Sequence, residues 1–286
     1  MEVRLADCAG FCFGVKRAVD TVYEQLKNGK TIYTYGPIVH NEEVVRELSE
    51  KGVRVLENKE DLKQLKAGES IPTVIIRAHG VAKEIYDIME ANGLECIDAT
   101  CPFVKKIHRI VELKSNEGYH VIVVGDPKHP EVEGIVGWCP GPVTVLETPD
   151  QAENFVKTEG EKLCIVSQTT YNYNKFQYIV EIFEKKGYND SVVNTICNAT
   201  EERQRSAKAI AAEADVMIVI GGKHSSNSRK LYEICQRECE HTYFIQTLDD
   251  LHLDLPKAVR LVGITAGAST PNNIIEEVQK HVRIKF

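Results

Sequence analysis

The stretch VRLADCAGFCFGVKRAVDTVYEQL, residues 3–26, begins with a short apolar segment, turns through glycines to Cys12 and continues as an amphipathic pattern typical of a helix. Two later stretches have the same order of features: LECIDATC ends at Cys101, VVNTIC ends at Cys197, and a helical pattern follows each cysteine. Similar lengths of chain separate the three cysteines. We interpret the pattern as an internal repeat in which each unit supplies a strand, a cysteine and a helix.

The rest of each repeat predicts the fold class. Three apolar runs that predict buried strands each end at a glycine, and each glycine lies at the same sequence distance from the preceding cysteine. A later set of predicted strands, VIIRAHG, LCIVSQTT and LVGITAGAS, ends near His79, Thr169 and Ser269. Strands that alternate with helices indicate parallel βαβ units. We therefore expect an α/β fold of three related modules with mostly parallel sheets, in a three-lobed ring around one central site. The modules are residues 14–97 (with an N-terminal strand in 1–13), 98–193 and 194–280.

The composition is that of an ordinary globular protein. Hydrophobic residues make up 43% of the 286 residues and charged residues 27%. The net charge of −7 disfavours nucleic acid and anionic membranes as partners. No apolar run is long enough to span a bilayer, and the start MEVRLADCAG lacks the pattern of a secretory signal. We expect a cytoplasmic protein whose nine cysteines are thiols rather than disulfides.

Cys12, Cys101 and Cys197 each precede the start of a predicted helix. Unpaired backbone N–H groups and the helix dipole favour a thiolate there, which is the metal-binding form of cysteine. A structural zinc site normally closes with four ligands, and paired Cys-x-x-Cys motifs are missing from the sequence. Three thiolates are suited to an iron–sulfur cluster, and a four-iron cluster would keep one iron open as a Lewis acid. The alternative is that all three cysteines are buried at packed helix starts.

Other cysteines are expected to have less specific roles. Cys96 and Cys164 lie within strand-like apolar runs and are predicted to be core residues. Cys235 and Cys239 lie four residues apart on a predicted helix, where packing or exposure to solvent is favoured over metal binding. Cys8 remains a rival to Cys12 as a ligand, although the other two repeats have no cysteine at the matching position.

Polar residues beside glycines follow many of the predicted strands. Imidazole donors, hydroxyl groups and the N–H groups of turns and helix starts bind phosphate oxygens. Because these polar residues occupy corresponding positions in the repeats, they predict a site for a phosphate or diphosphate. Each residue taken singly also fits an ordinary surface or core role. The residues are His40, His79, His129, Ser225, Ser226, Asn227 and Ser269.

Glu131 and Thr169 are candidates for the chemistry itself. A carboxyl group in a partly dry pocket has a raised pKa and can deliver a proton. Thr169 is placed to hydrogen-bond a substrate hydroxyl. The simpler alternatives are a solvated acid for Glu131, and strand propensity or helix capping for Thr169.

Nine blocks in this order resemble the bacterial 4-hydroxy-3-methylbut-2-enyl diphosphate reductases, the last enzymes of the non-mevalonate isoprenoid pathway. The resemblance covers nearly the whole chain. The blocks are GFCFGVKRAV, GPIVHNEEVV, RAHGV, DATCPFV, GDPKHPEVEG, SQTT, TICNATEERQ, GGKHSSNS and GITAGASTP.

The resemblance implies a pseudo-threefold cloverleaf of three α/β domains around a central [4Fe-4S] cluster. It implies that two electrons and two protons remove the allylic hydroxyl of (E)-4-hydroxy-3-methylbut-2-enyl diphosphate, giving isopentenyl diphosphate, dimethylallyl diphosphate and water. It also implies a ferredoxin or flavodoxin as electron donor, and we expect a monomer. By position, the cluster ligands are Cys12, Cys101 and Cys197; the substrate-binding residues are His40, His79, His129, Thr169, Ser225, Ser226, Asn227 and Ser269; and the catalytic residues are Glu131, Thr169 and His129.

Two other function classes use the same features. A zinc-dependent hydrolase of a phosphorylated metabolite would use the same cysteines and histidines, and it would contain zinc without labile sulfide. A non-catalytic redox sensor would hold a cluster but turn over no substrate, and the chain lacks the basic recognition helix typical of such regulators. His224 departs from the resemblance, and its role is open.

Overall fold

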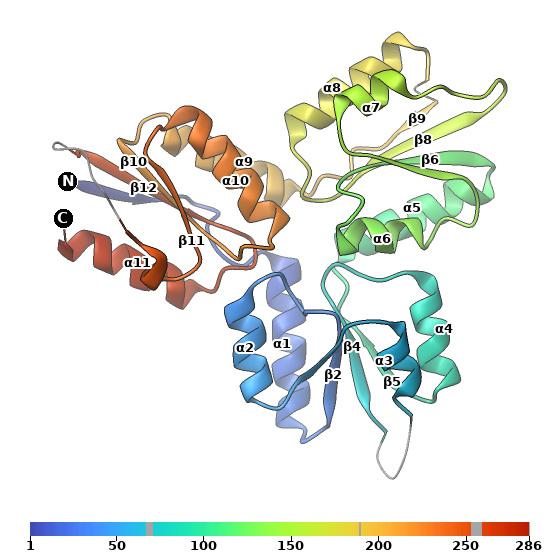
Figure 1. The fold of residues 1–286 in the computed structure, drawn as a ribbon, viewed down its shortest axis with the longest axis horizontal. Helices are drawn as coiled ribbons and strands as arrows, with labels where there is room; N and C mark the ends of the chain where they lie inside the picture. The colour runs from blue at the N-terminus through green and yellow to red at the C-terminus, as the bar shows by residue number, and fades with distance from the viewer. Residues whose placement is uncertain (67–70, 189, 253–258, 286) are drawn as a thin grey trace. The chain divides into compact units, whose positions relative to one another are not determined.

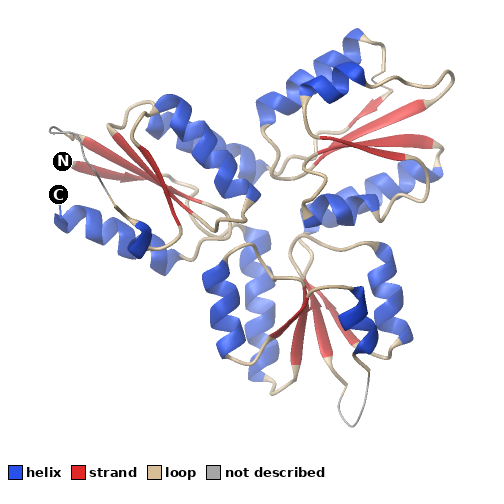
Figure 2. Cartoon of the chain, in the orientation of Figure 1, coloured by secondary structure: helices blue, strands red, loops and turns tan. Residues whose placement is uncertain are grey.

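The computed structural model describes residues 1–66, 71–188, 190–252 and 259–285. The described residues form three four-stranded sheets, each with every strand parallel to its neighbours, and helices pack on them (Figures 1 and 2). The predicted α/β class is confirmed. The chain divides into two compact units: unit 1 is 1–16, 39–47 and 197–286, and unit 2 is 17–38 and 48–196. None of the described helices is long and apolar enough to cross a bilayer.

The first sheet of unit 2 has the strand order β3-β2-β4-β5. Its central strand β4 reads TVII and is buried along its whole length, because helices cover both faces of the sheet. Helices α1 and α2 begin in unit 1 and continue into unit 2. The elements are α1 (Phe13–Lys27), β2 (Ile32–Tyr35), α2 (Glu42–Glu50), β3 (Arg54–Leu56), α3 (Lys59–Gln64), β4 (Thr73–Ile76), α4 (Lys83–Ala91) and β5 (Glu95–Asp98).

The second sheet of unit 2 has the order β7-β6-β8-β9. Successive residues of β6 point to opposite faces of the sheet and pack into different hydrophobic clusters. Ile122 packs in the cluster that contains Phe176 and Phe183. Val123 packs in the cluster that contains Val111. The elements are α5 (Pro102–Asn116), β6 (Tyr119–Val124), α6 (Pro130–Val136), β7 (Val143–Leu146), α7 (Pro149–Asn154), β8 (Lys162–Ser167), α8 (Tyr173–Lys185) and β9 (Ser191–Val192).

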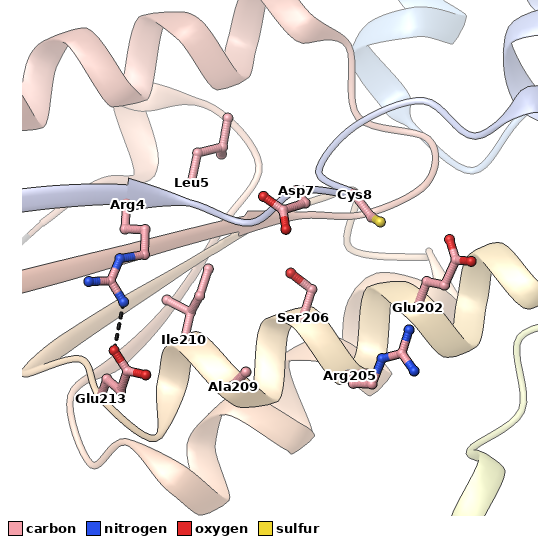
Figure 3. A pocket seen from close by; sticks show the side chains of 10 residues that line it. All are labelled: Arg4, Leu5, Asp7, Cys8, Glu202, Arg205, Ser206, Ala209, Ile210 and Glu213. Carbon is pink, nitrogen blue, oxygen red and sulfur yellow. Dashed lines mark hydrogen bonds and ion pairs between the residues drawn. The ribbon is translucent and has the colours of Figure 1, made fainter.

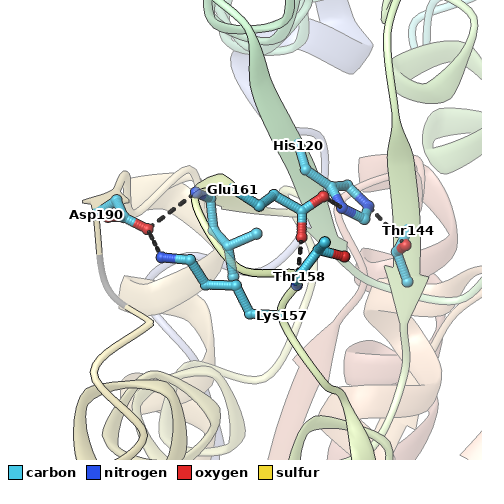
Figure 4. Close-up of polar contacts among 7 residues, drawn as sticks. His120, Thr144, Lys157, Thr158, Glu161 and Asp190 are labelled. Atoms are coloured by element: carbon cyan, nitrogen blue, oxygen red, sulfur yellow. Dashed lines mark hydrogen bonds and ion pairs between the residues drawn. The ribbon is translucent and has the colours of Figure 1, made fainter.

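A polar network closes the amino end of this second sheet (Figure 4). His120, at the start of β6, lies 2.7 Å from a Glu161 carboxylate oxygen through Nδ1 and 2.8 Å from Thr144 Oγ1 through Nε2. Asp190 pairs with Lys157 at 2.6 Å and accepts a hydrogen bond from the β8 backbone. Both ring nitrogens of His120 therefore have hydrogen-bond partners. His120 lies at the opposite end of β6 from the loop that contains His129.

Unit 1 contains the third sheet, with the order β1-β12-β10-β11. Helices α9 and α10 pack on one face and α11 on the other (Figure 1). The elements are β1 (Glu2–Leu5), α9 (Asn198–Ala211), β10 (Val216–Ile220), α10 (Ser226–Glu238), β11 (Thr242–Ile245), the 3₁₀ turn η1 (Leu248–Asp250), β12 (Leu261–Ala266) and α11 (Asn272–Lys285).

The N-terminal strand differs from the expectation. A strand in residues 1–13 is expected to belong with the first module, but β1 pairs with β12 of the third sheet, with Val3 opposite Val262. The sequence of a strand indicates its buried face but not its neighbour, because parallel pairing joins segments far apart in the chain.

Candidate functional site in two halves

In each sheet, predicted site residues follow the carboxyl ends of strands, where ligands of open parallel sheets gather. His79 follows β4, Thr169 follows β8 and Ser269 follows β12. The unit 2 half-site is Cys101, His79, His129, Glu131 and Thr169. The unit 1 half-site is Cys12, Cys197, His40, Ser225, Ser226, Asn227 and Ser269.

Glu131 is the central acid of the unit 2 half-site. It lies in the first turn of α6 and is only 1% exposed. Its carboxylate accepts hydrogen bonds from the Thr169 backbone N–H at 2.6 Å and from Thr169 Oγ1 at 2.7 Å. Burial raises the pKa of Glu131 to about 7, although the two hydrogen bonds from Thr169 act in the opposite direction. The carboxyl group is therefore able to hold or release a proton near neutral pH.

His129 connects this acid to the rest of the unit 2 half-site. It is the N-cap of α6, and its Nδ1 accepts a hydrogen bond from the Glu131 backbone N–H at 3.1 Å. Because Nδ1 accepts, the neutral ring has its proton on Nε2. The His129 ring meets the His79 ring edge to face, with 5.5 Å between centroids.

Cys101 lies beside His79 through the backbone. It is the N-cap residue of α5, its side chain makes no capping hydrogen bond, and its N–H donates to the Ala78 carbonyl at 3.0 Å. Gly80 completes the turn with a φ of +72°, and a Cβ there would lie 2.7 Å from His108. Only glycine fits this position, so the close approach of the His108 side chain on α5 and the positive φ together fix the backbone that presents His79.

The Cys101 loop has its own supports. Asp98 accepts a hydrogen bond from the Thr100 N–H at 2.9 Å and pairs with Lys105 at 2.6 Å. From α1, Arg17 Nη2 donates to the Thr100 carbonyl at 2.7 Å. The residue before the cysteine is therefore held by both a carboxylate and a guanidinium.

In the unit 1 half-site, Cys12 and Ser269 are joined through the turn after β12. The Cys12 N–H donates to the Ala268 carbonyl at 3.1 Å, and Ser269 Oγ donates to the His40 carbonyl at 2.9 Å. Cys197 is the N-cap residue of α9, with no side-chain capping bond. Both thiols are half-buried.

The start of α10 presents the uncharged donors that the sequence predicted. Ser225 is the N-cap, and its Oγ accepts hydrogen bonds from the Ser228 N–H at 3.3 Å and from Ser228 Oγ at 3.0 Å. Asn227 is 4% exposed, yet both atoms of its amide lack hydrogen-bond partners among the described residues. Buried polar groups are nearly always paired. This orphaned amide at a helix N-terminus fits an anionic ligand.

Three of the other cysteines are buried. Cys164, Cys235 and Cys239 lie in the core, and burial raises the pKa of Cys235 to about 12. The predicted core position of Cys164 is confirmed. Of the two roles favoured for Cys235 and Cys239, the structure shows packing, with their thiols directed toward backbone carbonyls. The prediction for Cys96 is wrong. Cys96 lies on the edge strand β5 and is exposed, since an edge strand has fewer neighbours to cover it.

Cys8, the rival ligand, lines a pocket of about 540 Å³ between β1 and α9 (Figure 3). Arg205 and Glu202 line the same pocket, and Arg4 forms an ion pair with Glu213 at its edge. His224 is exposed and lies 3.9 Å from a Glu42 carboxylate oxygen. Neither Cys8 nor His224 has a geometry that assigns it a chemical role.

Sequence reasoning missed two arginines. Arg17 supports the Cys101 loop, and Arg203 is buried in unit 1 beside the segments that contain Cys12 and Cys197. Their positions in the sequence could have indicated them, because each arginine lies within two helical turns after a predicted ligand cysteine. The assignment of the predicted residues as ligands, substrate binders and catalysts stays a prediction.

Comparisons with known proteins agree on one family. The family model described as LytB protein matches residues 3–283. The chain is 46% identical to the 4-hydroxy-3-methylbut-2-enyl diphosphate reductase of Caldanaerobacter subterraneus over 99% of this chain and 97% of that protein. It is 45% identical to the reductase of that name from Clostridioides difficile, over 97% of this chain and 98% of that one.

Solved structures agree in fold. The E-1-hydroxy-2-methyl-but-2-enyl-4-diphosphate reductase of Plasmodium falciparum matches with a TM-score of 0.89 and 32% identity, over 99% of this chain and 87% of that one. A solved (E)-4-hydroxy-3-methyl-but-2-enyl diphosphate reductase, the terminal enzyme of the non-mevalonate pathway, matches with a TM-score of 0.70 and 43% identity, over 99% and 100% of the two chains. With a family model that matches nearly its whole length and relatives at this level of identity, the chain belongs to the LytB protein family.

Proposed function

We propose that this protein reduces (E)-4-hydroxy-3-methylbut-2-enyl diphosphate to isopentenyl and dimethylallyl diphosphates at a [4Fe-4S] cluster bound by Cys12, Cys101 and Cys197. It is an oxidoreductase of the last step of the non-mevalonate isoprenoid pathway, as the names of its relatives indicate. The observation that carries the proposal is the unit 2 half-site. There a buried acid with a pKa near 7, Glu131, is joined through two histidines to the loop of a ligand cysteine.

The donor set fits an iron–sulfur cluster. Cys101 and Cys197 are N-cap residues, Cys12 directly precedes α1, and all three thiols are partly accessible rather than sealed in a core. Helix N-termini favour the thiolates that iron requires. When bound, such a cluster supplies electrons one at a time and a Lewis-acidic iron for the substrate hydroxyl.

The residues of the unit 1 half-site suit the diphosphate. The start of α10 offers backbone N–H groups, the Ser225 and Ser226 hydroxyls and the unpaired amide of Asn227. Ser269 belongs to the same half-site, and the imidazoles of His40, His79 and His129 would add donors. A diphosphate anchored there would orient the rest of the substrate for reaction.

Glu131 and Thr169 would deliver the proton. The overall reaction adds two electrons and two protons, breaks the allylic C–O bond and releases water. Protonated Glu131 donates to the departing hydroxyl oxygen, and Thr169 Oγ1, which is 2.7 Å from the Glu131 carboxylate, holds that hydroxyl in line. His129 Nδ1 accepts a hydrogen bond from the Glu131 backbone N–H, and its Nε2–H would donate a hydrogen bond to the substrate.

We also propose the electron donor, the oligomeric state and the cellular compartment of the enzyme. Electrons would come from a ferredoxin or flavodoxin, and the enzyme would act as a monomer. None of the nine cysteines, all of which lie in the described part of the chain, forms a disulfide. Thiolate ligands must remain reduced to bind iron, so we place the protein in the cytoplasm, where thiols are kept reduced.

Anaerobic purification tests the proposal. We expect about four irons and four labile sulfides per chain for one cubane cluster, a cluster EPR signal after reduction, and turnover of the hydroxylated diphosphate with dithionite and a viologen. Cys101→Ser should lose or damage the cluster, whereas Cys96→Ser, which changes an exposed cysteine on β5, should retain it. Zinc without sulfide would favour the hydrolase, and an intact cluster without turnover would favour the sensor.

A further inference from the structure

Arg203 is a buried cation in unit 1. It lies on α9, within two helical turns of Cys197, and is only 3% exposed. Its Nη1 donates to the carbonyl of Cys8 and, at 3.0 Å, to the carbonyl of Ala266. A single side chain therefore connects three segments that are far apart in the sequence.

Each of these segments leads to the proposed cluster. Cys8 lies in the loop between β1 and Cys12, and Ala266 is the last residue of β12. The turn after Ala266 contains Ala268, whose carbonyl accepts the hydrogen bond from the Cys12 N–H. Arg203 thus joins α9, whose N-cap is Cys197, to the loop before Cys12. It also joins α9 to the end of β12, whose following turn contacts Cys12.

The charge of Arg203 has no carboxylate partner among the described residues of unit 1, and its Nε–H has no hydrogen-bond partner there. Burial lowers the pKa of Arg203, and the groups that oppose this shift are the sulfurs of Cys12, Cys8 and Cys197. An unpaired buried charge is strongly destabilising unless other charges compensate it. The compensation available to this guanidinium is thiolate charge.

Unit 2 shows a related arrangement on another helix. Arg17 lies on α1, within two turns of Cys12, and donates to the carbonyl of Thr100, the residue before Cys101. In both units an arginine from the helix after one ligand cysteine supports the backbone beside another. The recurrence favours a role tied to the ligands over incidental packing.

We propose that Arg203 is a positioning residue of the cluster, an inference that rests on the proposed function. Its two carbonyl bonds hold the Cys12 and Cys197 segments in one geometry. Its charge offsets part of the negative charge of the thiolate-bound cluster, and therefore stabilises the reduced state of the cluster more than the oxidised state. Hydrogen bonds and nearby charge are among the features by which proteins set cluster potentials.

The test compares Arg203→Met and Arg203→Lys with the control Arg205→Met, all as anaerobically purified full-length holoprotein. Arg205 lies two residues further along α9 and is exposed at the pocket of Figure 3, so its change removes the same charge without touching these carbonyls. The readouts are the midpoint potential, from an EPR-monitored redox titration, and the rate of iron release to a chelator.

For Arg203→Met we expect at least a tenfold shift of the redox equilibrium toward the oxidised cluster, which is about 59 mV for one electron. We also expect faster iron release. Arg203→Lys, which keeps a cation, should fall between the wild type and Arg203→Met, and Arg205→Met should stay within twofold of the wild type. If Arg203→Met fails to fold, Arg203→Gln replaces it with the same expectation, because glutamine is neutral and retains a donor.

A potential in Arg203→Met equal to that of Arg205→Met would overturn the proposal, even if iron were released faster. Equal shifts in the lysine and methionine variants would also overturn it, because charge would then not be the cause. These failures differ from failure of the proposed function, which would appear as absence of a cluster from the wild-type protein.

Discussion

At the scale of single residues, the chemistry depends on what surrounds each polar group rather than on its identity. Glu131 and Glu133 lie on the same short helix, but Glu131 is buried and Glu133 is exposed. Burial raises the pKa of Glu131 to about 7, because loss of hydration outweighs the two hydrogen bonds from Thr169. The pair provides a direct comparison between a proposed catalytic acid and an ordinary surface acid.

Glu131→Gln should lower kcat by about 10²–10⁴-fold, the usual contribution of a general acid, and change KM little. The wild-type kcat should fall as pH rises through about 7, because Glu131 then ionises and has no proton to give. The variant should lose this pH dependence. Steady-state assays with an artificial reductant between pH 5.5 and 8.5 measure both effects.

Stability provides an independent readout of the same group. A raised pKa stabilises the folded state only while the carboxyl is protonated, so this contribution is complete below about pH 4.5 and is lost as pH rises through about 7. Urea unfolding should show the loss in the wild type and not in Glu131→Gln. Glu133→Gln is the control and should match the wild type in kcat and pH profile. A Glu131→Gln enzyme with normal activity would exclude Glu131 as the proton donor.

At the scale of secondary structure elements, unit 2 depends on close contact between α6 and the loop after β4. Trp138, just after α6, donates its indole N–H to the Val81 carbonyl at 2.9 Å. A Cβ at Gly137 would lie 2.2 Å from the Cβ of Ala82, whereas a Cβ at Gly134 would lie 3.4 Å from the Val81 backbone. Because α6 begins at His129 and the loop begins near His79, this contact sets where the two histidines meet.

Gly137→Ala should therefore destabilise the protein by about 1–3 kcal/mol, as expected for overpacking at a tight contact. It should also lower kcat, since the separation of the His79 and His129 loops would change. Chemical denaturation measures the first effect and turnover assays the second. Gly134→Ala, on the same helix but with ordinary contact distances, should be nearly neutral. Equal effects of the two changes would show that the tight contact is unimportant.

At the scale of the whole molecule, the proposed ligands are shared between units. Cys12 and Cys197 belong to unit 1, whereas Cys101 belongs to unit 2. A cluster bound by all three cysteines would be a ligand of the folded chain only. A ligand that binds only the native arrangement stabilises it by mass action.

Removal of the cluster should separate the unfolding of the two units. In differential scanning calorimetry, we expect the anaerobic holoprotein to unfold in one transition, and the chelator-treated apoprotein and Cys101→Ser to unfold in two at lower temperature. Cys96→Ser should retain the single transition. Identical thermograms for holoprotein and apoprotein would contradict a cluster that joins the units.

Much of the fold was predictable from the sequence. The run Ile32–Tyr35 coincides with β2, and the helices expected after Cys12, Cys101 and Cys197 are present as α1, α5 and α9. These predictions succeeded because strands covered on both faces have continuous apolar sequences, and because helix starts have local signals. The partner of β1, the exposure of Cys96 and the hydrogen bonds of Arg203 were not predictable, since each depends on residues distant in the chain.

Residue order alone specifies the three strand–cysteine–helix repeats, the residue types of both half-sites and the family resemblance, because these depend on local patterning and motif spacing. Tertiary packing buries Glu131 against Thr169 and raises its pKa. It also buries the Asn227 amide without a hydrogen-bond partner among the described residues and lets Arg203 connect the Cys12 and Cys197 segments. Burial and long-range hydrogen bonding arise only when distant segments pack together, and no local pattern specifies them.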